Sequence, residues 1–349
     1  MRLQLNPLTV KKIRRFQSIR RGYYSLIILV TMIVLSLGAE LLVNSRALVV
    51  SYNGALYWPT YGNLIPGAFF GLDYQYETNY RALAERFDAE GAGNWVIMPP
   101  VPYNPYENDF RENTLPPTAP SLVERHFCGT DASGRDVLAR LVFGFRLAIF
   151  FSLALLIATF VTGISTGSAM GYFGGTFDLF FQRIIEIWTS VPALYVIIII
   201  ASVVIPNFWI LLTILWAFGW MSITWTMRTV VYKERTRDYV LAARALGASH
   251  GRIIARHILP NTVSIIVSYM PFQVANGIVS LAALDFLGFG LPPPEPSWGE
   301  LLQQGWANLS AWWLSGSVVA AMVLTLVLVT FIGEAVREAL DPKMHTTYE

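Results

Sequence analysis

The chain has 349 residues, of which 54% are hydrophobic and only 14% are charged, and its mean hydropathy is +0.48. This composition excludes a soluble globular protein and predicts a polytopic membrane protein. The formal net charge of +2 is small, and no nucleic acid is expected as a partner. The chain has a single cysteine, Cys128, which excludes an internal disulfide.

Six apolar stretches of about 20 residues, the length that a helix needs to cross a bilayer, lie along the chain. The predicted fold class is therefore an all-α polytopic membrane protein with six transmembrane helices. The first stretch follows a basic segment, residues 1–22, but it is longer than the apolar region of a secretory signal and no small-residue cleavage site follows, so we expect a retained anchor. The stretches are residues 23–43, 147–172, 188–205, 208–231, 262–283 and 313–336.

The distribution of Lys and Arg predicts the orientation of these spans. Residues 1–22 contain seven such side chains and residues 232–260 contain six, whereas residues 285–312 contain none. Because basic residues are enriched in cytoplasmic loops, both termini, including the tail at residues 343–349, and the 232–260 loop are expected in the cytoplasm.

The long connection at residues 44–137 is then expected outside the cell membrane, in the periplasm. It carries eleven acidic residues against six Arg, and many Pro and aromatic residues. The prolines favour extended and turn structure, with one possible helix at residues 79–89. We interpret the insertion as a small lobe on the outer face and, as a hypothesis, as a docking surface for an extracytoplasmic binding protein; a flexible linker is the alternative.

Residues 129–137 lead into the second span and read Gly-Thr-Asp-Ala-Ser-Gly-Arg-Asp-Val. Ser133 followed by Asp136 is a capping-box pattern, which predicts the start of a helix there. No nucleophile or base accompanies Asp131 or Asp136, so no catalytic role is assigned to them.

Several positions within the spans suggest packing or bending. Thr159, Gly163, Gly167 and Gly171 recur every fourth residue, which is typical of a helix face that packs closely against a neighbour, with a hinge as the alternative. Pro192 and Pro271 are better hinge candidates. Arg183 and Glu186 are expected to pair on one helix face, while Arg228 and Glu334 are expected to extend toward the membrane interface.

Residues 238–261 form an unusual loop, rich in Ala, Arg and Gly. They predict two short helices separated by Gly247, which can adopt the left-handed conformation. Ser249 is the predicted cap of the second helix, and Pro260 is expected to end the unit where the next span begins. A basic amphipathic loop lying on the lipid surface is the alternative. The first helix is predicted from Ala242, Ala243, Ala245 and Leu246, and the second from Ile253, Ile254 and Ile258.

This loop resembles the cytoplasmic signature of permease subunits of ATP-binding-cassette importers, E-A-A, three residues, G, nine residues, I-x-L-P. Five positions match that spacing, whereas Leu241 replaces the Glu of the signature and His257 its first Ile. The run before the second span and the run F-L-G-F-G then P-P-x-P-S-W-G at residues 286–299 resemble the second permease of peptide and nickel importers. With the long acidic insertion added, the whole chain is most similar to members that take up microcin C and oligopeptides. The matching positions are Ala242, Ala243, Gly247, Leu259 and Pro260.

The resemblance implies a type I importer fold, with a permease core at residues 138–342, in a bacterial inner membrane. It implies a second permease subunit, ATPase subunits and a periplasmic substrate-binding protein as partners, besides membrane lipid. ATP and Mg are expected on the ATPase subunits, and no cofactor or metal on this chain. The residues implied in coupling to the ATPase are Ala242, Ala243, Gly247, Ala248, Ile253, Leu259 and Pro260.

Other classes of function have less support. The chain contains no phosphate-binding loop of the G-x-x-x-x-G-K-[ST] type, and its four His are not spaced as metal ligands. The centres of the spans are almost uncharged, which argues against an ion-driven carrier. A self-contained channel or carrier and a membrane enzyme nevertheless remain alternatives at this point.

Overall fold

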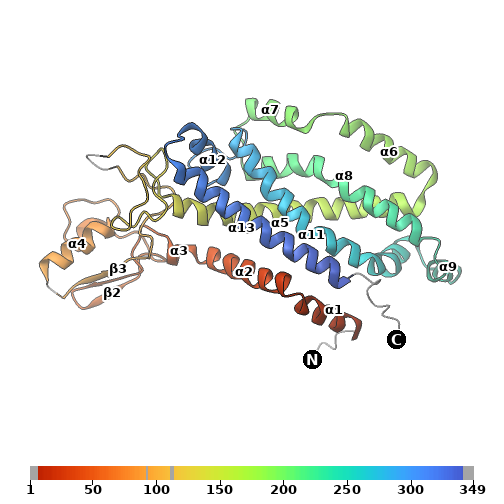
Figure 1. Ribbon diagram of the computed structural model, residues 1–349, viewed down its shortest axis with the longest axis horizontal. Coiled ribbons are helices and arrows are strands. Elements are labelled where there is room, and N and C mark those ends of the chain that lie inside the picture. The colour runs from red at the N-terminus through yellow and green to blue at the C-terminus, as the bar shows by residue number, and fades with distance from the viewer. Residues whose placement is uncertain (1–6, 92, 111–113, 341–349) are drawn as a thin grey trace.

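The computed structural model describes residues 7–91, 93–110 and 114–340, which form a bundle of long helices with a small lobe at one end (Figure 1). The N-terminal part comprises α1 (Pro7–Ser18), α2 (Arg20–Leu37), α3 (Ala39–Leu42), β1 (Val49–Tyr52), β2 (Ala55–Tyr57), the short 3₁₀ helix η1 (Gly67–Phe70), α4 (Tyr80–Glu90) and β3 (Trp95–Ile97). The remainder comprises α5 (Val137–Phe173), α6 (Gly175–Thr189), α7 (Ala193–Val203), α8 (Phe208–Glu234), α9 (Asp238–Ala245), α10 (His250–Arg252), the π-helical η2 (Ile253–Ile258), α11 (Leu259–Phe286), α12 (Trp298–Ala307) and α13 (Trp312–Leu340).

Five of the described helices are long and apolar enough to cross a membrane, and the pair α6 and α7 adds a sixth span if it crosses as one. The prediction of one continuous helix at residues 188–205 is wrong, because α6 and α7 meet at an angle of 62°. Pro192 stands at the N-cap of α7, and a proline disfavours α-helical backbone at the residue before it. The third span is therefore broken at the proposed hinge residue.

The longest helix, α5, packs along α8 through its small residues. A Cβ atom at Gly163 would lie 2.6 Å from the carbonyl oxygen of Trp220, and one at Gly171 would lie 2.5 Å from that of Arg228. Both distances are too short for any larger side chain, so the two backbones are in contact along this face. The interpretation of the stripe as a close packing surface is thus confirmed.

The insertion folds into a lobe with its own core. Strands β1, β2 and β3 form an antiparallel sheet in the order β2-β1-β3, which the sequence did not predict, and the predicted helix is present as α4, capped by the Asn79 side chain. Val50, Phe70 and Leu83 are at most 1% exposed in this core. A packed core of this kind is what a folded lobe has and a flexible linker lacks.

The bundle has two distinct ends (Figure 1). The lobe, α12 and the start of α13 lie at one, here called the lobe end. Helices α1 and α9 and the end of α13 lie at the other, here called the α9 end. The motif stretch at residues 238–260 is therefore separated by the length of the spans from the other two, residues 129–137 and 286–299.

Candidate functional site

The segment at residues 238–260 forms a capped turn at the α9 end. Helix α9 ends at Ala245, and Gly247 follows with a φ of +78°. The amide of Ala248 donates to the carbonyl of Ala243 at 3.1 Å, and the amide of Gly247 donates to that of Arg244 at 3.0 Å. This pair of bonds is a Schellman motif, which satisfies carbonyl groups that the end of a helix would leave free. The left-handed glycine predicted at 247 is confirmed.

One face of this segment is buried against the bundle. Val240, Ala243, Ile253 and Ile258 share an apolar cluster with residues of α5 and α8, including Tyr172, Met227 and Val231. Their side chains are at most 7% exposed. The segment therefore cannot shift without displacing the ends of α5 and α8, because close-packed apolar side chains transmit strain.

The other face points away from the bundle. Leu246, at the turn, is 88% exposed, and Leu241, one helical turn earlier, is 48% exposed. Exposed leucines at the tip of a membrane protein are characteristic of a contact surface. Beside them lies an open cleft of about 570 Å³ whose lining includes Arg235, Arg244 and His250.

The seven residues predicted to couple this chain to an ATPase divide between these two faces. Ala243 and Ile253 are buried in the apolar cluster, with Ala248 and Leu259 packed against it. The exposed members are Ala242, Gly247 and Pro260. The structure thus brings four of the seven together in the packed face and leaves three accessible.

The second half of the segment differs from the prediction. Ser249 occupies the N-cap position, but its side chain makes no capping hydrogen bond. Pro260 does not end the unit, because one helix continues from His250 to Phe286. The π-helical turn η2 ends at Ile258, two residues before the proline, and a π-helical turn marks an interruption of the regular hydrogen-bond ladder within a helix that continues. The turn at Gly247 is accordingly joined to the fifth predicted span by continuous helix.

Two ion pairs lie on α6 and α8. The predicted pair of Arg183 and Glu186 is present at 2.5 Å. Arg228, which was expected to extend toward the membrane interface, has a partner that the sequence did not reveal: its Nε and Nη2 atoms each lie 2.6 Å from the carboxylate of Asp178 on α6. This two-pronged ion pair ties the broken span to α8, since the planar guanidinium matches a carboxylate.

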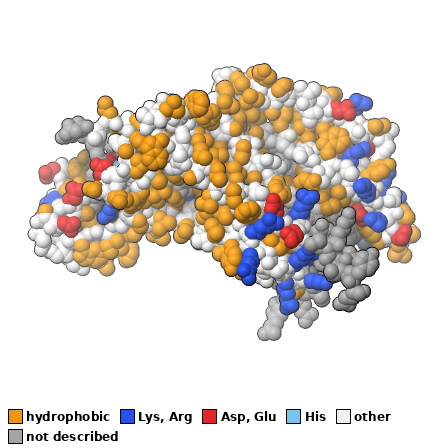
Figure 2. All heavy atoms as spheres, viewed as in Figure 1, with side chains coloured by type: hydrophobic (Ala, Val, Ile, Leu, Met, Phe, Trp, Pro, Cys, Tyr) orange, Lys and Arg blue, Asp and Glu red, His pale blue; other side chains and the backbone are white. Residues whose placement is uncertain are grey.

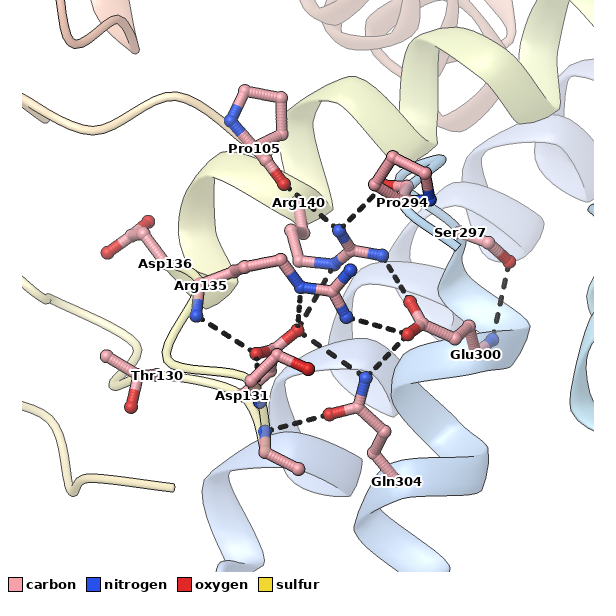
Figure 3. Close-up of polar contacts among 12 residues, drawn as sticks. Pro105, Thr130, Asp131, Arg135, Asp136, Arg140, Pro294, Ser297, Glu300 and Gln304 are labelled. Atoms are coloured by element: carbon pink, nitrogen blue, oxygen red, sulfur yellow. Dashed lines mark hydrogen bonds and ion pairs between the residues drawn. The ribbon is translucent and has the colours of Figure 1, made fainter. Parts of the chain in front are cut away.

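At the lobe end, the other two motif stretches meet in a buried ionic cluster (Figure 3). Arg135 lies 2.7 Å from both Asp131 and Glu300, and Arg140 pairs with Glu300. Arg140 also donates to the carbonyls of Pro105 at 3.0 Å and Pro294 at 3.1 Å. Asp131 and Arg140 are fully buried, so the two arginines and two carboxylates neutralise one another where water is absent.

Sequence reasoning missed most of this cluster. It found the stretch around Asp131 but not its partners Arg140, Glu300 and Gln304, nor helix α12. The available signal was Arg140 itself, because a charged residue beside an apolar span requires a partner. The start of α5 was also misread: Asp136, not Ser133, is the N-cap, and it accepts from the amide of Ala139 at 2.7 Å.

His126 connects the lobe to the same N-cap. Its Nδ1 lies 2.7 Å from Asp136 and its Nε2 lies 3.1 Å from Asp109, while its ring stacks on Tyr103 at a centroid distance of 3.9 Å. Burial lowers the pKa of His126, but the hydrogen bonds to the two carboxylates outweigh burial and the pKa is raised. The imidazole thus bridges the lobe and the start of α5 through these two carboxylates.

Comparison with known proteins decides the family. A family model described as the inner membrane component of binding-protein-dependent transport systems matches residues 163–346, more than half of the chain. The chain belongs to this family. It is therefore a multi-pass permease of a bacterial-type inner membrane with a type I importer fold.

Relatives of this permease span nearly its whole length. The inner membrane ABC transporter permease protein YejE of Escherichia coli (strain K12) is 42% identical over 97% of this chain and 98% of the relative. The peptidoglycan transport system permease protein YejE of Agrobacterium fabrum is 36% identical over 97% and 94%. The oligopeptide transport system permease protein OppC of Haemophilus influenzae is 33% identical over 64% and 73%. Among solved structures, the MetNI methionine ABC transporter in inward facing conformations matches 58% of this chain and 97% of that chain, with 18% identity and a TM-score of 0.48.

Family membership settles the class of function. The permease is a transport subunit and not an enzyme, and ATP hydrolysis takes place on partner subunits. It works with other permease, ATPase and substrate-binding components of its system. A self-contained channel or carrier and a membrane enzyme are thereby set aside.

Proposed function

We propose that this permease imports oligopeptides or peptide-like compounds of the microcin C type, as one of two different permease subunits that together form the translocation path. The support is the set of relatives, which are named as permeases for peptides, oligopeptides, dipeptides and peptidoglycan. ATP and Mg bind to the ATPase subunits, and this chain binds neither.

The α9 end faces the cytoplasm and the lobe end faces the periplasm. Two observations support this orientation: the basic segments at residues 7–22 and 232–260 belong to the same end, and the acidic lobe lies at the opposite one (Figures 1 and 2). In this orientation the lobe is accessible to a periplasmic substrate-binding protein, for which it provides a docking surface.

The segment at residues 238–260 couples the permease to the ATPase. The observation that carries this function is its two-sided construction: Leu241 and Leu246 are exposed, whereas Ala243 and Ile253 pack into the bundle. An apolar face of a helix that enters a groove on a partner gains contact area there. The buried face then conveys the displacement to α5, α8 and α11, and the bundle shifts between inward and outward opening.

Two substitutions test the coupling. Gly247→Pro removes the positive φ that the turn requires, and Ala243→Glu places a carboxylate in the apolar cluster. We expect both variants to insert in the membrane with their partners, to hydrolyse ATP, and to fail in uptake. Normal uptake by both at normal amounts in the membrane would argue decisively against the coupling role.

The substrate class requires a separate experiment. A strain that lacks this gene is complemented with the wild-type chain, and the uptake of labelled oligopeptides is compared with that of free amino acids. We expect complementation to restore peptide uptake alone. Restored uptake of amino acids without peptides would refute the substrate class and leave the coupling intact.

A further inference from the structure

Helix α1 lies against the spans at the α9 end and fixes a lysine there. The Lys12 ammonium donates to the Ser264 hydroxyl on α11 at 3.2 Å. An ammonium group has three donors, and a hydroxyl satisfies only one of them. Lys12 is half-buried, so its remaining donors point into a site that is partly shielded from water.

Two open clefts lie where α11 and α13 meet: Lys12 lines the first, and its partner Ser264 lines both. The first, of about 460 Å³, is lined by Lys12 and by apolar side chains from three helices. The second, of about 390 Å³, is lined by Arg337 of α13 and by Ser264, Ser268 and Tyr269 of α11. Both clefts share Ser264 and Leu340. The apolar lining of the first consists of Ile13, Phe16, Pro260, Val263, Val267, Val336, Ala339 and Leu340.

The acidic groups nearby on α13 are already engaged. Arg21 lies 3.5 Å from both Glu334 and Glu338. Across the described ranges 7–91, 93–110 and 114–340, neither Lys12 nor Arg337 has a carboxylate partner. Lys and Arg side chains gather on this end of the molecule (Figure 2), so the clefts have an excess of positive charge.

We propose that an anionic phospholipid of the cytoplasmic leaflet binds here, with its phosphate on Lys12 and Ser264 and an acyl chain in the first cleft. Charge complementarity favours this occupant, because the oxygens of a phosphodiester accept hydrogen bonds from the remaining N–H groups of Lys12. The apolar lining of the first cleft suits an acyl chain. Basic sites between transmembrane helices on the cytoplasmic side are suited to anionic headgroups. The site rests on the cytoplasmic orientation of the α9 end.

The position of the site gives the lipid a structural role. Pro260 contributes to the cleft and lies at the end of the 238–260 segment. A lipid held between α1, α11 and α13 therefore joins the N-terminal helix to the helix that carries this segment. Its acyl chain fills the cleft that these three helices line.

The test uses the assembled transporter in nanodiscs of phosphatidylethanolamine with phosphatidylglycerol, followed by native mass spectrometry of retained lipid. We expect the wild type to retain phosphatidylglycerol, and Lys12→Ala to retain it about fivefold more weakly, since one basic residue near the surface contributes about that factor. Lys12→Arg should retain the lipid because it keeps the charge. Lys11→Ala is the matched control, since Lys11 is exposed on the same helix.

Equal retention by the Lys12→Ala and Lys11→Ala variants would overturn the proposal, and so would equal retention of the two lipids by the wild type. A zero-length carbodiimide crosslink between Lys12 and a carboxylate of residues 341–349 would also overturn it, by identifying the chain itself as the occupant. Peptide uptake into liposomes made of the same two lipids tests the proposed function separately.

Discussion

The two ends of this permease are held together by different forces. At the lobe end, Asp131, Arg135, Arg140 and Glu300 form a buried ionic cluster with short, directional contacts. At the α9 end, the 238–260 segment is held mainly by an apolar cluster and a capped turn, with hydrogen bonds from Tyr239 to Glu234 and between His250 and Tyr172 beside them. Ion pairs in a dry site tolerate little displacement, whereas an apolar cluster has no directional bonds and can move together with the helices that share it. The comparison indicates a fixed lobe end and a movable α9 end.

The largest expected effect on stability comes from breaking the ionic cluster. Glu300→Ala leaves Arg135 and Arg140 with one carboxylate between them, so we expect a loss of about 3–5 kcal/mol and poor accumulation in the membrane. The double variant Arg140→Met with Glu300→Met should recover part of this loss, because it leaves Asp131 and Arg135 paired. Thermal unfolding in detergent measures both. If the loss of stability in the double variant equalled the sum of the losses from the two single substitutions, Arg140 and Glu300 would not interact.

The next largest expected effect is a pH dependence of stability that comes from His126 at the lobe end. The pKa of His126 is raised in the folded state above its unfolded value of about 6.5. The contribution of His126 to the free energy of unfolding is therefore complete below the unfolded pKa and is lost as the pH rises through the folded pKa. Hydrogen bonds to charged groups contribute about 1.5–3 kcal/mol.

His126→Gln should therefore be destabilised relative to the wild type at pH 6, and the difference should shrink toward pH 9. Melting temperatures across this range measure it, with His257→Gln as the control at the other end. A difference that stays constant with pH would show that the charge of His126 contributes nothing.

A smaller effect is expected at the turn of the α9 end. Gly247→Ala should cost about 1–2 kcal/mol, because a side chain is strained at a φ of +78°. Gly251→Ala is the matched control: both glycines face open space, but only Gly247 has the left-handed backbone. Melting temperatures of the two variants should differ accordingly. If the variants melted together, the turn would not depend on glycine.

The sequence predicted those features that depend on local periodicity or local backbone chemistry. The spans, the close packing of the small residues on α5, and the left-handed Gly247 all follow from patterns within one helix or turn. It did not predict features that depend on distant partners: the pairing of Arg228 with Asp178, or the contact of Arg140 with α12. Pro260 was expected to end the unit, but a proline is tolerated in the first turn of an α-helix. Here the π-helical turn η2 leads into that turn, so the helix continues past the proline. The small sheet was missed because its strands have only three or four residues each.

The most direct test of the difference between the two ends compares two exposed leucines. Leu246 is 88% exposed at the α9 end and Leu309 is 79% exposed at the lobe end. Each is changed to Ser, which should alter stability by less than about 0.5 kcal/mol at such surface positions. The ATPase subunits that co-purify with the permease in mild detergent are then quantified. We expect Leu246→Ser to lose the ATPase and Leu309→Ser to retain it. Equal retention by both variants, or loss only with Leu309→Ser, would contradict ATPase docking on the 238–260 segment.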